Sequence, residues 1–310
     1  MRNPGHRQAL TVLTLLVGLG GCEAIEGGVP HPVDALDYPV AVAVDPDQRG
    51  LWATSGNFDL AWQGSAIVGL DAEGHGVAPA GADGQPMAIQ VGGMAGPVAI
   101  RHQGGQTVGL YVASRTEDAL YHVTVTGQGT ERAVACEGGT REGSDILRCP
   151  VEGALKTFEL TGTDGEVTSL DLGVDPYALH LFRSPQVPDQ ELLAVGSMGT
   201  RTGISQLSLF SLDDDGTPEP VDAVSLAAGL VSVVAHPVTG RLYTSHKDAN
   251  LFQVFDVVAP DTGDEAPAPQ LKLTGILSVP FQAFSTNTLK SHGRELTFSA
   301  DGTHAAVGAQ

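Results

Sequence analysis

The chain has 310 residues, of which 42% are hydrophobic, so it can bury a substantial core in one large domain or two smaller ones. Its 16 Lys and Arg residues are outnumbered by 36 Asp and Glu residues, which gives a formal net charge of −20. Such acidity repels phosphate backbones and anionic lipid headgroups, so nucleic acid is excluded as an expected partner. No cofactor is expected, although the acidity leaves a divalent cation such as calcium open.

Residues 1–21 have the layout of a secretory signal peptide. Arg2 and Arg7 supply a basic start, and an apolar run follows over residues 9–19. This run is shorter than the roughly 20 residues that a membrane-spanning helix needs. Small residues then precede Cys22, as they do at a signal-peptide cleavage site. The sequence therefore predicts export.

The stretch Leu19-Gly20-Gly21-Cys22 resembles the lipobox of bacterial lipoproteins. In that family the cysteine is lipidated and becomes the first mature residue, so the resemblance implies lipidation of Cys22. An ordinary signal peptide with a chance cysteine is the alternative. Glu23 follows the cysteine rather than Asp, which in some Gram-negative bacteria implies the outer membrane. We therefore expect a protein of the cell envelope or periplasm that contacts the membrane only through its lipid anchor.

Residues 22–38 are predicted to be a membrane tether, because glycine and proline recur there and oppose regular structure. From about Pro39 onward, short apolar runs bounded by turn residues indicate buried strands. The first unit holds four predicted strands, at residues 40–44, 51–55, 66–71 and 87–91. The second strand of successive units begins at Leu51, Leu110, Leu192 and Leu242. Subtraction gives spacings of 59, 82 and 50 residues, near the 40–50 residues of a propeller blade.

Two segments carry a more specific resemblance, Gly240-Arg241-Leu242-Tyr243-Thr244 and Phe298-Ser299-Ala300-Asp301-Gly302. Their turn-then-strand pattern resembles the YVTN or lactonase-like β-propeller superfamily, over roughly residues 39–310. The resemblance implies an all-β fold, a β-propeller of four-stranded blades. The units number about four, and a last one stops after two strands at Gln310. We therefore expect a propeller that is incomplete at its C-terminus, unless N-terminal strand material completes the last blade.

Cys136 and Cys149 are the cysteines that remain beside Cys22, and an even pair in an exported chain predicts a disulfide. Closing this short loop stabilises a fold by about 3 kcal/mol in the chain-entropy model. A metal site is disfavoured, because neither cysteine has a Cys or His partner at zinc spacing. The same long interval contains predicted strands at 157–160 and 167–172, so it is either an elaborated blade or an extra degenerate one.

Motifs for common catalytic centres are missing from the sequence. There is no Gly-x-Ser-x-Gly elbow, no His-Glu-x-x-His zinc motif and no Walker A loop. Asp45 and Asp47 match the first and third positions of an EF-hand calcium loop, but Gly56 occupies the twelfth position, where that loop needs Glu. The catalytic residues are therefore unknown, and no metal ligands are assigned.

In the propeller family, the loops between the second and third strands lie at the end of the channel that binds ligands. Here these loops hold the candidate ligand-binding residues Asn57, Asp59, Arg115, Glu117, Asp118, Arg201, His246, Lys247 and Asp248. Solvated loop tips are the alternative interpretation. His102, His180 and His236 fall near the ends of inner strands, where they could line the channel in different registers, which disfavours a shared metal.

These features favour a surface or periplasmic lipoprotein whose propeller is a binding or scaffold module for an unknown protein or small molecule. The alternative is a lactonase-like hydrolase with its site at the channel mouth, which rests on fold analogy alone. Asp59, Glu117 and His246 are the residues available for such a site. A calcium-stabilised structural protein is a third hypothesis, motivated by the acidity.

Overall fold

The computed structural model describes residues 31, 36–45, 50–59, 61–71, 88–127, 132–142, 146–162, 165–199, 204–226, 229–247, 249–259, 268–278 and 293–309. The expected signal peptide, Cys22, Arg201 and Asp248 lie outside these residues. The described part is nearly all β-strand. None of its segments is a helix long and apolar enough to cross a membrane.

The first sheet begins with the four strands expected for the first unit. They are β1 (Pro39–Val44), β2 (Gly50–Ser55), β3 (Ser65–Asp71) and β4 (Ala88–Val91). Each strand pairs antiparallel with the next. The segment predicted as a tether also touches this sheet, because His31 is 2% exposed and its Nε2 lies 2.9 Å from Ser55 Oγ.

Three further sheets repeat the same up-and-down order of four strands. The second contains β5 (Ala95–Gln103), β6 (Gln106–Ser114), β7 (Ala119–Thr126) and β8 (Ala133–Ala135). The third contains β13 (Val174–Ser184), β14 (Val187–Gly199), β15 (Ser205–Leu212) and β16 (Pro218–Leu226). The fourth contains β17 (Leu230–Ala235), β18 (Leu242–His246), β19 (Ala249–Val258) and β20 (Gln270–Ser278). A final pair follows, β21 (Gly293–Phe298) and β22 (Ala305–Ala309).

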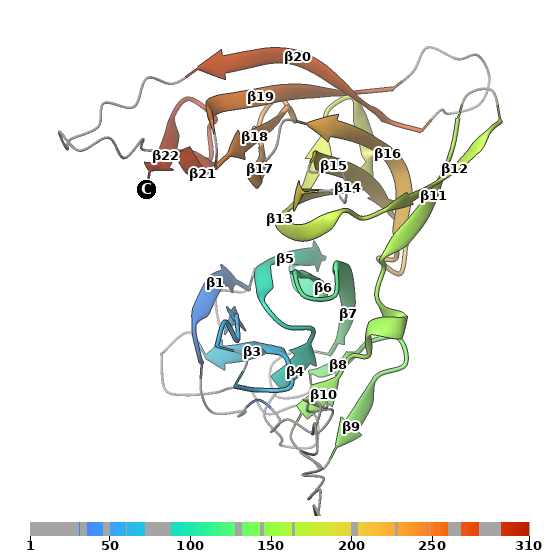
Figure 1. Cartoon of the computed structure of the whole chain (residues 1–310), viewed down its shortest axis with the longest axis vertical. Coiled ribbons are helices and arrows are strands. Elements are labelled where there is room, and N and C mark those ends of the chain that lie inside the picture. Colours follow the sequence, from blue (N-terminus) through green and yellow to red (C-terminus); the bar gives the residue numbers. More distant parts are fainter. Residues whose placement is uncertain are drawn as a thin grey trace, which may run out of the picture.

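The first strands of the five sheets are neighbours around a common centre (Figure 1). β1 contacts β5, β5 contacts β13, β13 contacts β17 and β17 contacts β21. The expected β-propeller of four-stranded blades is therefore confirmed, with a last blade of two strands. The sheets are not closed into a ring, as expected for an incomplete propeller.

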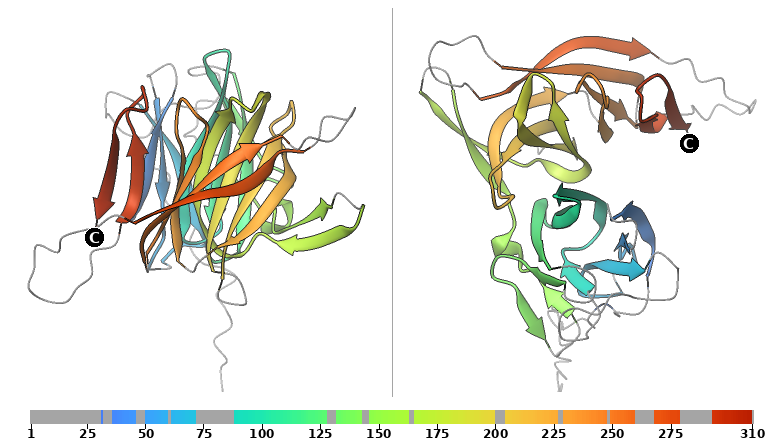
Figure 2. Two further views of the ribbon diagram at one scale, coloured as in Figure 1. Left: turned by 90° about the horizontal axis from the view of Figure 1, so that it is seen from above. Right: turned by 180° about the vertical axis from the view of Figure 1, so that it is seen from behind.

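The long interval after the second sheet is not an extra blade. β10 (Ile146–Arg148) pairs in parallel with β4, and β9 (Thr140–Glu142) extends that edge, so both belong to the first sheet. After the short 3-10 helix η2 (Val151–Gly153), β11 (Thr157–Thr161) and β12 (Val167–Asp171) form a separate hairpin that projects from the body (Figure 2). The predicted disulfide is confirmed, with the Cα atoms of Cys136 and Cys149 5.8 Å apart.

Three buried apolar clusters lie between successive sheets. Trp52 and Ile89 of the first sheet pack with Leu110 of the second. Tyr111 of the second sheet packs with Leu193 and Phe210 of the third, together with Phe158 of the hairpin. A third cluster joins the third and fourth sheets. Each large side chain removed from water in this way contributes about 1.5–3 kcal/mol.

A buried polar contact also joins the second and third sheets. Arg101 on β5 is 7% exposed, and its Nε donates to Glu191 Oε2 on β14 at 2.9 Å. The same guanidinium donates to the carbonyl oxygens of Asp213 and Asp214, at 2.9 and 3.1 Å. Tyr111 Oη donates to Gly216 O at 2.6 Å. The turn between β15 and β16 is thereby fixed on the second sheet.

Gly216 tests this contact, because its φ is +87° and an added Cβ would lie 2.6 Å from Arg101 Nη1. We expect Gly216→Ala to lower the free energy of unfolding by about 2–4 kcal/mol, since both the backbone and the buried guanidinium would be strained. Gly104→Ala is the matched control, because Gly104 also has a positive φ, +60°, with no atom within 4 Å of an added Cβ. It should cost only about 1 kcal/mol. Urea denaturation measures both, and equal losses would contradict the importance of this contact.

Candidate functional site

The predicted loop end of the propeller is organised by serine side chains. Serines at or near the ends of the second strands are all buried: Ser55, Ser114, Ser197 and Ser245. Ser114 Oγ donates to Gly93 O at 2.9 Å, and Ser197 Oγ donates to Leu172 O at 2.7 Å. Each of these carbonyls belongs to the segment that leads into the inner strand of the same blade. The repeated serine therefore fixes how the chain enters the centre of the propeller.

A second serine position links one blade to the next. Ser65, at the start of β3, accepts a hydrogen bond from Ala95 N at 2.9 Å and donates to Gly56 O at 3.0 Å. Ser205 makes the equivalent pair, to Leu230 N at 3.1 Å and Met198 O at 2.8 Å. These buried hydroxyls satisfy backbone groups that no ladder reaches.

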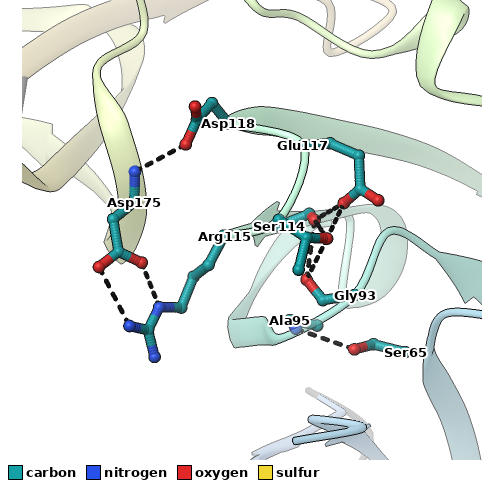
Figure 3. A network of polar contacts seen from close by, with 9 residues as sticks. Ser65, Gly93, Ala95, Ser114, Arg115, Glu117, Asp118 and Asp175 are labelled. Atoms are coloured by element: carbon teal, nitrogen blue, oxygen red, sulfur yellow. Dashed lines mark hydrogen bonds and ion pairs between the residues drawn. The ribbon is translucent and has the colours of Figure 1, made fainter. Parts of the chain in front are cut away.

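Arg115 and Asp118, two of the candidate residues, converge on Asp175 (Figure 3). Arg115 forms a two-pronged ion pair with the Asp175 carboxylate, with Nη2 at 3.0 Å from Oδ2. Asp118 Oδ1 accepts a hydrogen bond from Asp175 N at 2.8 Å. The hydrogen bond that Arg115 donates to the Asp175 carboxylate is the main cause of a raised pKa for Arg115. The contact joins the β6–β7 turn to the entrance of β13, so it holds the second and third sheets together.

Sequence reasoning missed Asp175, the common partner in this contact. Its backbone has a positive φ of 64°, which is uncommon outside glycine. The available signal was the pair Asp175-Pro176 directly before an inner apolar strand. Such a signal marks a turn but gives no indication of which loop lies opposite.

The third candidate in the same turn, Glu117, faces its own loop. The Ser114 hydroxyl lies between the Glu117 carboxylate and the carbonyl of Gly93 (Figure 3). The Thr116 hydroxyl contacts the same two groups. Thr116 Oγ1 is 2.5 Å from Glu117 Oε2 and 3.0 Å from Gly93 O. This carboxylate therefore helps to close the turn.

The other candidates in the described residues also make local contacts. Asn57 is 1% exposed and closes its own loop, with Nδ2 donating to Trp62 O at 2.9 Å and Oδ1 accepting from Trp62 N at 3.1 Å. Asp59 accepts from Ala61 N at 3.2 Å. His246 is fully buried, and its Nε2 lies 3.3 Å from Thr244 Oγ1. The backbone N–H of Lys247 donates to Gly229 O at 2.7 Å.

A cavity of about 520 Å³ lies beside the β6–β7 turn. Its walls come from this turn, the base of the hairpin and β15, and its lining includes Glu117, Asp118, Lys156, Asp171 and Gln206. The Gln206 side chain donates from Nε2 to the Asp171 carbonyl at 2.9 Å. The structure thus brings two of the predicted candidates, Glu117 and Asp118, to one cavity. This cavity lies between the second and third sheets, whereas the sequence predicted a site at the mouth of the channel.

A second cavity, of about 430 Å³, lies between the inner strands β13, β17 and β21. His180 and His236 both line it, whereas exposed His102 on β5 does not. Burial lowers the pKa of His180 to about 4, so this imidazole is neutral at pH 7. His236 is fixed by backbone groups, since Nε2 donates to Gly302 O at 3.0 Å and Nδ1 accepts from Val238 N at 3.2 Å. Within the described residues, no three His, Cys, Asp or Glu side chains gather in a way that could hold a metal.

No protein-family model matches the chain, and no curated protein matches it. Solved structures do match. A structural-genomics target from Lactobacillus plantarum is 12% identical, with a TM-score of 0.51 over 90% of this chain and 66% of that chain. The β-propeller domain of Cps50 (Swd1) from Myceliophteria thermophila is 14% identical, with a TM-score of 0.47 over 87% of this chain and 67% of that chain.

A candidate 6-phosphogluconolactonase from Bacteroides uniformis is 16% identical, with a TM-score of 0.43 over 88% of this chain and 78% of that chain. The chain thus spans about two thirds of the Lactobacillus plantarum protein, at 66% of its length. The match to the Lactobacillus plantarum protein supports the expected fold. Identities this low indicate a shared fold and leave the activity open.

The lowered pKa of His180 predicts a pH-dependent stability. Above pH 6.5 the imidazole is neutral in both states, but between pH 6.5 and 4 only the unfolded chain takes up this proton. The free energy of unfolding therefore decreases as the pH is lowered from 6.5 to 4. The contribution of His180 to this decrease is about 2 kcal/mol, because its partial exposure to solvent reduces the effect. His180→Gln should flatten the fall, whereas His304→Gln, at an exposed histidine, should leave it unchanged. Urea titrations at several pH values measure this, and parallel curves for wild type and His180→Gln would contradict the assignment.

Proposed function

We propose that this chain is a lipoprotein of the bacterial cell envelope whose propeller is a binding module for a protein or small-molecule ligand. The anchor rests on the Leu19-Gly20-Gly21-Cys22 stretch and on Glu23 after it. The binding role rests on the geometry of the loop end. The observation that carries it is the way in which Arg115, Asp118 and Glu117 are held by other groups of the chain.

Polar groups held in this way form a rigid surface, which limits the ordering cost when a partner binds. A hydrolase instead needs ionisable groups that converge on one reacting atom. Asp59 comes from the β2–β3 connection, Glu117 from the β6–β7 turn and His246 from the end of β18, in three different sheets. Asp59 and Glu117 bond within their own loops, and His246 lies beside Thr244 of its own strand. This dispersion favours binding over hydrolysis.

The cavity beside Glu117 and Asp118 supplies a place for a ligand. Its volume of about 520 Å³ falls in the usual range for small-molecule sites. Its lining mixes carboxylates, the Lys156 amine and the Gln206 amide, so the preferred ligand is polar.

The anchor is tested by replacing Cys22 with serine in full-length protein expressed in a Gram-negative host. Wild type should incorporate labelled palmitate and partition into detergent, while Cys22→Ser should lose at least nine tenths of the label. Cys136→Ser is the control, because it removes a cysteine that forms the disulfide and should keep the label. Equal labelling of wild type and Cys22→Ser would overturn the anchor proposal.

The binding role is tested against the hydrolase alternative with glucono-δ-lactone and γ-butyrolactone. We expect the pure protein to hydrolyse neither lactone above the buffer rate. Turnover that Glu117→Gln or His246→Gln lowers at least 100-fold, with unchanged urea denaturation, would replace the binding proposal with a hydrolase. Asp256→Asn, on the distant strand β19, is the control for unrelated charge loss.

A further inference from the structure

We infer that the free edge of β12 is a docking strand for an extended basic peptide, which would join the β11–β12 hairpin as a third strand. This inference rests on the proposed binding function and assigns a partner to the cavity at the base of the hairpin. Three observations support it. Backbone groups of β12 point away from β11, no described strand lies beside the outer edge of β12, and the surrounding charge is negative.

The register of the hairpin fixes which backbone groups face outward. Leu172 N donates to Lys156 O at 2.7 Å, and Gly162 N donates to Glu166 O at 2.7 Å. In an antiparallel pair, hydrogen-bonded and non-hydrogen-bonded positions alternate, so even-numbered residues of this segment bond to β11. Ser169 faces Glu159 at a non-hydrogen-bonded position. The N–H and C=O groups of Ser169 therefore point away from β11.

The outer edge of β12 has no strand beside it in the described part of the chain. The hairpin is a sheet of two strands, and β11 is the one that contacts β16 (Figures 1 and 2). One outward group nearby is already used, because the Asp171 carbonyl accepts from Gln206 Nε2 at 2.9 Å. An unpaired edge of this kind is a template for an added strand.

The charge beside this edge selects a basic partner. Three carboxylate residues line the neighbouring cavity, Glu117, Asp118 and Asp171, against one amine, Lys156. The chain as a whole carries a formal charge of −20, so its field attracts a basic segment and repels an acidic one. Ser169 and Asp171 of β12 border the cavity, so side chains of an added strand would reach it.

The test measures anisotropy of a fluorescein-labelled heptapeptide of alternating lysine and valine, added to the full-length protein. We expect saturable binding that weakens at least tenfold between 50 and 300 mM salt, and no binding of the counterpart with glutamate for lysine. Ser169→Pro should weaken binding at least tenfold, because it removes an outward N–H while the ladder to β11 keeps its bonds. Ser169→Ala, which keeps the backbone, should bind within twofold of wild type.

Urea denaturation of both variants checks that the fold is retained. If Ser169→Pro does not fold, the same question is put to the wild-type protein with peptides methylated on alternate backbone nitrogens. One methylation pattern should then weaken binding tenfold and the other should not, since only every second amide faces the added edge.

Equal binding by Ser169→Pro and wild type would overturn the docking strand and leave a binding module with its site elsewhere. Equal binding of the acidic peptide would overturn the charge argument and the inference with it. Absence of any peptide binding would also overturn this inference. The lactone assay judges the proposed function independently.

Discussion

Adjacent blades of this propeller share no hydrogen-bonded ladder in the described part of the chain, so the apolar clusters between their faces attach one blade to the next. Apolar packing is strong but has little directional preference. Two buried ion pairs fix the orientation of neighbouring sheets. Arg101 pairs with Glu191 between the second and third sheets, and Arg132 pairs with Asp45 between the second and the first. Asp45 also accepts from Trp52 Nε1 at 3.0 Å, which ties the core of the first sheet to the same point.

At the loop end, too, polar side chains fix the orientation of strands that apolar packing holds together. Its serines fix the entry of the inner strands β5 and β13, and Ser65 and Ser205 each bond to the backbone of the following blade. The polar residues that suggested a ligand-binding surface thus also make the intramolecular contacts that hold this surface in place. A binding surface and a structural clamp are compatible here, since groups held by the fold lose little freedom when a partner arrives.

The local part of this architecture was predictable from the sequence, and the long-range part was not. Leu51, Leu110, Leu192 and Leu242 each fall in the second strand of a blade, because apolar runs and turn residues report local backbone preferences. The disulfide followed from the cysteine count together with the expectation of export. The convergence of Arg115 and Asp118 on Asp175 could not be predicted, since it depends on which loops the packed sheets bring together. The cavity beside the hairpin arises in the same way.

The parallel pairing of β10 with β4 has a consequence for the order of assembly. By sequence β10 follows the second blade, yet by hydrogen bonding it belongs to the first. The first blade therefore cannot complete its edge until the whole second blade has been synthesised. Pairing across so long a stretch of chain slows folding, because loop-closure entropy is lost before the contact forms. Nor can the second blade open far while β10 and the disulfide hold its outgoing segment, so the two blades form one cooperative folding unit.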